Sequence, residues 1–82
     1  MTPILITWKD ATSVDEWVDL EEAAKLGLHT VHTIGWLVSQ DLEKYVVAGN
    51  WDVDRPGIAQ HIAIPKVCVA SVCIFPDVLA TL

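Results

Sequence analysis

The sequence has 82 residues, of which 52% are hydrophobic, and it carries a formal net charge of −6 with a pI of about 4.6. This length fits one domain, residues 1–82, and the acidic balance excludes direct DNA or RNA binding over the general surface because phosphates are repelled. No apolar run reaches the ~18 residues of a membrane-spanning helix, and the start has no secretory signal pattern, so we expect no membrane partner.

The first third of the chain predicts one strand and one helix. Pro3–Trp8 is a short apolar run with β-branched and aromatic members, typical of a strand. Ser13–Glu16 matches a capping box, apolar residues at helical spacing follow it, and Gly27 stands where a C-terminal cap is expected. We therefore expect a helix at about Val14–Leu26, with Trp17 in the core and an acidic outer face of Asp15, Glu16, Asp19, Glu21 and Glu22.

The stretch Leu28–Ala48 is typical of a strand, a polar turn at 39–44 and a second strand that resumes at Tyr45. Alternation places two sets of side chains on opposite faces, and both faces are largely apolar. Gly35 in the middle of the first strand suggests a bend or a bulge. One face carries Val31, Thr33, Gly35 and Leu37, and the other carries His32, Ile34, Trp36 and Val38.

The last third predicts two more strands. Gly49–Gly57 is rich in turn-forming residues, and Ile58–Ile64 then alternates as a strand does until Pro65 interrupts it. Val67–Phe75 predicts the final strand, which Pro76 ends, and Asp77–Leu82 forms a short tail. The predicted fold is mainly β with one helix (α+β). It is either a small five-stranded SH3-like or Sm-like barrel or a strongly bent antiparallel sheet.

The apolar fraction exceeds what a small barrel can hide, so we expect a homo-oligomer that covers the remaining apolar surface. Cys68 and Cys73 are an odd number of residues apart on the expected strand and point to opposite faces, so they cannot pair with each other. Two unpaired thiols are typical of a reducing cytoplasm.

The sequence offers few groups for chemistry. His29 and His32 would face opposite ways on a strand, so we expect no metal site, and the cysteines and serines lack an activating setting, so we expect no catalytic residue and no cofactor. Asp52 and Asp54 would share a face and could bind a cation or act in acid–base work, but such residues are more often solvated turn formers.

The best candidate ligand site lies in the turn-rich stretch. Trp51 could stack on a nucleobase while Arg55 contacts a phosphate or carboxylate, with Asn50 nearby. His61 or Lys66 could join from a strand end or from another subunit. The competing interpretation is that Trp51 plugs the end of the barrel or a subunit contact.

Five segments together resemble small, mostly uncharacterised proteins of tailed bacteriophages. They are TWKDA (Thr7–Ala11), the Trp17–Leu20 helix, TIGWLVSQD (Thr33–Asp41), YVVA (Tyr45–Ala48) and IPKVCV (Ile64–Val69). The resemblance implies a protein of the host bacterial cytoplasm. Several phage proteins of this size are oligomeric sponges that sequester a nucleotide second messenger and so silence antiphage immunity.

Two functional hypotheses follow. The first is an oligomeric anti-defence protein that binds a cyclic nucleotide or an ADP-ribose derivative without turning it over. The second is a protein–protein interaction module, either an inhibitor of a host protein or a virion accessory protein, that acts through the acidic helix face. An enzyme has little support.

Overall fold

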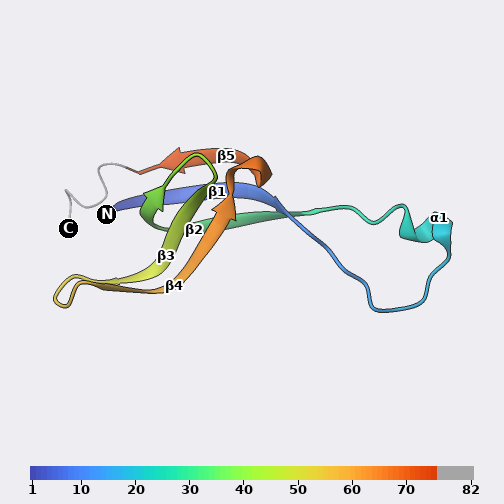
Figure 1. Cartoon of the computed structure of the whole chain (residues 1–82), viewed down its shortest axis with the longest axis horizontal. Helices are drawn as coiled ribbons and strands as arrows, with labels where there is room; N and C mark the ends of the chain where they lie inside the picture. Colours follow the sequence, from blue (N-terminus) through green and yellow to red (C-terminus); the bar gives the residue numbers. More distant parts are fainter. Residues whose placement is uncertain (76–82) are drawn as a thin grey trace.

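The computed structural model describes residues 1–75, which form a five-stranded antiparallel sheet in the order β4-β3-β2-β1-β5 (Figure 1). The prediction of a mainly β fold with five strands and one helix is confirmed. The strands are β1 (Thr2–Asp10), β2 (His29–Gln40), β3 (Lys44–Asp52), β4 (Gly57–Pro65) and β5 (Val69–Ile74). A four-residue helix, α1 (Leu20–Ala23), precedes β2, and a 3-10 turn, η1 (Lys66–Cys68), precedes β5.

The long central strand β2 joins the two halves of the sheet. Along most of its length it pairs with β1, from Asp10 opposite His29 to Thr2 opposite Leu37. Trp36 and Leu37 pair with β1 on one side and with β3 on the other, and the register with β3 shifts between Leu37 and Ser39. The irregularity predicted at Gly35 therefore falls two to four residues further along the same strand. Because a bulge increases local twist, β3 and β4 turn away from β1 and β5 (Figure 1).

The core lies between these two halves. Its buried members alternate along β1 at Ile4, Ile6 and Trp8 and are completed by Val47 of β3 and Ile64 of β4. The Trp8 indole Nε1 donates to Thr33 Oγ1 at 2.9 Å, so this large side chain is buried with its polar atom satisfied. Of the two faces of β2, the one with Val31 and Leu37 packs against this core, while His32, Ile34 and Val38 on the other face are exposed.

The helix prediction is wrong in extent. Only Leu20–Ala23 is helical, and its N-cap is Asp19, whose carboxylate accepts from the backbone N–H of Glu22 at 2.8 Å, not Ser13. Trp17 is 100% exposed and is not part of the core. Most helical stability in proteins comes from packing an apolar face, and this segment projects away from the sheet (Figure 1).

Two boundaries in the last third also differ from the prediction. Gly49–Asp52 continues β3 because it pairs with the start of β4, so the turn is confined to residues 53–56. The last strand begins at Val69, not Val67, because Lys66–Cys68 forms η1. Pro76 and the predicted tail Asp77–Leu82 lie outside the described residues. Within residues 1–75, β4 and β5 are the two edges of an open sheet.

Candidate functional site

The tip of the β3–β4 hairpin is shaped by one carboxylate. Asp52 Oδ1 accepts the backbone N–H groups of Asp54 at 3.0 Å and of Arg55 at 3.1 Å. An aspartate that bonds its own backbone two and three residues on makes a local turn without help from distant residues. Asp52 is therefore a turn former, as one of the two sequence interpretations of Asp52 and Asp54 has it.

Beside this turn lies a shallow recess of about 270 Å³. It brings together two of the predicted site residues, Asn50 and Arg55, with the apolar side chain of Ile58. Asn50 Nδ2 donates to Gln60 Oε1 at 2.9 Å, which fixes the orientation of the amide. Gln60 has a φ of 55°, a left-handed conformation that is uncommon for a residue other than glycine. The remaining lining residues are Asp52, Gly57 and Ala59.

Trp51 does not line the recess. Its ring packs edge-on against Trp36 of β2, with 5.4 Å between the ring centroids and an interplanar angle of 70°. This T-shaped geometry is favourable for two aromatic rings. Trp51 remains partly exposed and lies close to the tip of the hairpin, opposite Ile58.

His61 and Lys66 lie away from the tip. His61 is exposed on β4 opposite Ala48, and Lys66 follows the far end of that strand. The Lys66 Nζ donates to Gln40 Oε1 at 3.3 Å and lies 4.7 Å from the centroid of the Tyr45 ring. A strand rises about 3.3 Å per residue, so the nine residues of β4 separate Arg55 from Lys66 by well over 20 Å. Within one subunit these two cations cannot meet on one small ligand.

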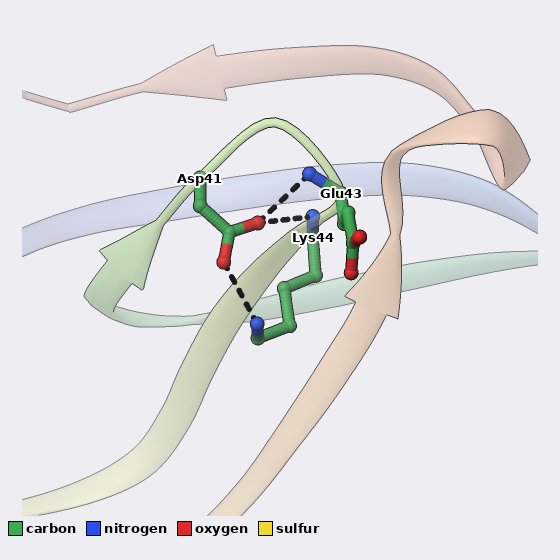
Figure 2. Close-up of polar contacts among 3 residues, drawn as sticks. All are labelled: Asp41, Glu43 and Lys44. Atoms are coloured by element: carbon green, nitrogen blue, oxygen red, sulfur yellow. Dashed lines mark hydrogen bonds and ion pairs between the residues drawn. The ribbon is translucent and has the colours of Figure 1, made fainter.

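Of the five cations, one is held in an ion pair. In the β2–β3 turn, Lys44 Nζ lies 2.8 Å from Asp41 Oδ2, while Asp41 Oδ1 accepts the N–H groups of Glu43 and Lys44 (Figure 2). The bond from the Lys44 ammonium, followed by the two backbone bonds, lowers the pKa of Asp41 from 3.8 to about 2. The same contact raises the pKa of Lys44. Among the described residues this is the only ion pair.

The sequence analysis missed one hydrogen bond and one recess. Gln60 holds the amide of Asn50, and only the turn residues between them hinted that these strands would pair. A second recess, of about 450 Å³, lies where the chain leaves β1 and returns to β2, and it is lined by Leu28 and Val67 among others. No sequence feature pointed to this recess, because Val67 was expected in the last strand, whereas its side chain is 95% exposed.

Within residues 1–75, no group of three or more His, Cys, Asp or Glu side chains could hold a metal ion. None of the helices in that range has the length and apolar character needed to cross a membrane. Both cysteines, Cys68 and Cys73, are free thiols. Comparisons of the chain with protein-family models, with curated proteins and with solved structures found no match.

Proposed function

We propose that the protein is a non-catalytic binding protein that works as a homo-oligomer and sequesters a small nucleotide. The observation that carries the proposal is the recess at the β3–β4 hairpin, where Arg55 and the oriented amide of Asn50 stand beside an apolar wall. An arginine guanidinium can donate two parallel hydrogen bonds to a phosphate, and an apolar surface can pack against a base or a ribose. The phage resemblance agrees with such a role, which we propose the protein performs in the host cytoplasm.

The charge balance of the recess leaves Arg55 as the group that meets the anion. Asp52 points its Oδ1 at two backbone N–H groups of the turn, which offsets part of its negative charge locally. Within residues 1–75 the Arg55 guanidinium has no carboxylate within ion-pair distance. The Trp36–Trp51 pair does not line the recess, so the apolar contact for a base or a ribose comes from Ile58. Lys66 would join only from another subunit.

Calorimetry tests the proposal with cyclic dinucleotides, cyclic trinucleotides and ADP-ribose derivatives as titrants. We expect one of these classes to bind and to be recovered chemically intact. Loss of one charged hydrogen bond costs about 1.5–3 kcal/mol, so Arg55→Ala should weaken binding by roughly tenfold or more. Lys25→Ala removes the same charge far from the hairpin and should bind normally. Absence of binding at high protein concentration, or unchanged affinity in Arg55→Ala, contradicts the proposal.

A second candidate function is a protein–protein interaction module. Its support is the exposed segment between β1 and β2, which carries five carboxylates, those of Asp15, Glu16, Asp19, Glu21 and Glu22. Acidic surfaces steer basic partners to a docking site. A bacterial protein that co-purifies stoichiometrically with the wild type, but not with a Glu21→Gln/Glu22→Gln variant, would favour this function over nucleotide binding.

We further propose that the sheet is a variant of the SH3-like or Sm-like barrel. Support comes from the strand order with β1 between β2 and β5, from the 3-10 turn before the last strand, and from the core enclosed between the two halves. Folds of this kind host many unrelated functions, so the architecture alone does not select between the two candidates.

A further inference from the structure

The segment between β1 and β2, residues 11–28, projects from the sheet as an arm (Figure 1). The molecule measures 54 Å along its longest axis but only 24 and 23 Å across. Two contacts join the legs of the arm near its root: Thr12 Oγ1 donates to the Gly27 carbonyl at 2.5 Å, and Lys9 Nζ donates to Thr30 Oγ1. These contacts hold the two ends of the arm together, and its tip lies away from its root (Figure 1).

The tip of the arm is apolar and uncovered. Trp17 is 100% exposed and Leu20 is 91% exposed, although each would gain from burial. Monomeric proteins rarely leave large apolar side chains together in solvent without an interaction that covers them. The arm also carries Val14, Val18 and Leu26, which are 44–55% exposed.

The root of the arm offers a matching surface. The recess of about 450 Å³ is lined by Leu28, Val67, Cys68 and Ala70, and the Val67 side chain is 95% exposed. Its one charged lining residue is Lys9, a cation, whereas the arm has five carboxylates against the single cation Lys25. The tip and the root are therefore complementary in apolar character and in charge.

The surface area agrees with an elongated subunit. The chain exposes 6330 Å², whereas a compact monomer of 9.0 kDa would expose about 4,900 Å². The projecting arm contributes to this difference, and an arm-to-arm contact between two copies would cover part of it.

We propose that two copies pair their arms in antiparallel fashion, so that Trp17 and Leu20 of each copy enter the root recess of the other. A two-fold axis makes the two tip-to-root contacts identical, so the assembly is a closed dimer. This proposal rests on the homo-oligomeric part of the proposed function, but it does not depend on nucleotide binding. The hairpin recess lies on the far part of the sheet from the arm, so the two properties can fail separately (Figure 1).

Sedimentation equilibrium on the full chain is the first test. We expect a dimer for the wild type and a dissociation constant raised about 100-fold or more for Trp17→Asp/Leu20→Asp, because central apolar anchors dominate interfaces. Both residues are exposed in the subunit, so its fold should survive, which circular dichroism would verify. The control Leu42→Asp, at a 97% exposed leucine in the β2–β3 turn, should remain dimeric. A monomeric wild type, or a double variant that stays dimeric, would overturn the proposal.

Disulfide trapping tests the antiparallel arrangement. In a Cys73→Ser background, Leu20→Cys treated with oxidised glutathione should form a covalent dimer linking residue 20 of one copy to Cys68 of the other, as mapped by mass spectrometry. Leu42→Cys in the same background should give no such link. A dimer joined through two copies of residue 20 would refute the tip-to-root geometry. Calorimetry on the Trp17→Asp/Leu20→Asp variant separates the two ideas, since a monomer that still binds nucleotide at the hairpin leaves that function standing.

Discussion

The backbone of Gly35 on β2 lies so close to Ala48 on β3 that a β-carbon at position 35 would stand 2.5 Å from the Ala48 carbonyl oxygen. The same β-carbon would lie 2.8 Å from Cγ1 of Val47. Gly35 pairs with Ile4 of β1 and directly precedes Trp36, where the pairing with β3 begins. Only a residue without a side chain allows the two halves of the sheet to approach this closely.

Gly35→Ala should therefore lower the free energy of unfolding. Overpacking a tight site costs about 1–3 kcal/mol, and the nearest atom here belongs to backbone, which places the expected loss toward the upper end. Urea unfolding measures it. Gly27→Ala is the matched control, because no atom lies within 4 Å of its β-carbon position, and it should be neutral or slightly stabilising. Equal effects of the two variants would contradict the close approach.

The Asp41–Lys44 pair should make stability depend on acidity. The native pKa of Asp41 is about 2, below its usual 3.8, so the pair stabilises the folded state above about pH 4. That stabilisation should be lost as the pH falls through about 2. Asp41→Asn keeps an acceptor for the two backbone N–H groups but lacks the charge, so its stability should change less over this interval. Unfolding midpoints measured from pH 5 to pH 2 give the comparison.

The neighbouring Glu43→Gln is the control for charge alone, since it removes a carboxylate from the same turn and leaves the partner of Lys44 in place. This variant should lose as much stability between pH 4 and pH 2 as the wild type does. The pKa of Lys44 is raised, so its share of the stabilisation is complete at neutral pH and should decline as the pH rises above 10.5. A pH profile of Asp41→Asn identical to that of the wild type would refute the assignment.

Ile64→Ala should be strongly destabilising. The side chain is fully buried between the two halves of the sheet, and removing a buried isoleucine side chain typically costs about 2–5 kcal/mol. That is a large fraction of the roughly 4–12 kcal/mol expected for a chain of this size. Ile34→Ala makes the same chemical change at a side chain that is 71% exposed and should cost less than about 1 kcal/mol. Chemical denaturation of both variants decides the point.

Replacing Gln60 by a β-branched residue should destabilise the protein. Its φ of 55° is costly for most side chains and most costly for branched ones, so Gln60→Val should lose about 1–2 kcal/mol. Gln60→Asn should be nearly neutral because asparagine tolerates this conformation. His61→Val, the same new residue at the adjacent exposed position, serves as the control. A Gln60→Val variant as stable as His61→Val would show that the left-handed conformation is not required.

The strands were predictable from sequence because their pattern reports burial directly. Ile4 and Ile6 alternate with partly exposed residues on β1, and the two predicted sets of β2 side chains lie on opposite faces, although the sequence did not show which set faces the core. The extension of β3 through Gly49 and Asn50 was not predictable, since both are turn formers. Their pairing with β4 overrides that local preference.

The arm shows where local patterns fail. Ser13–Glu16 and the apolar spacing after it satisfy the rules for a helix, yet they say nothing about what the apolar face packs against. In the single subunit nothing covers Trp17, and only one turn of helix forms. For the candidate site, the sequence correctly placed Asn50 and Arg55 together at one hairpin, but it could not show that Lys66 lies at the opposite end of β4.

The pairing of β1 with β5 has a consequence for synthesis on the ribosome. Ile4 lies opposite Ile74, so β1 waits for a partner strand that is translated about seventy codons later. Contacts so distant in sequence slow folding, typically into the millisecond-to-second range for small β proteins. Until β5 is synthesised, the apolar strand β1 lacks this partner and is exposed to aggregation unless chaperones protect it.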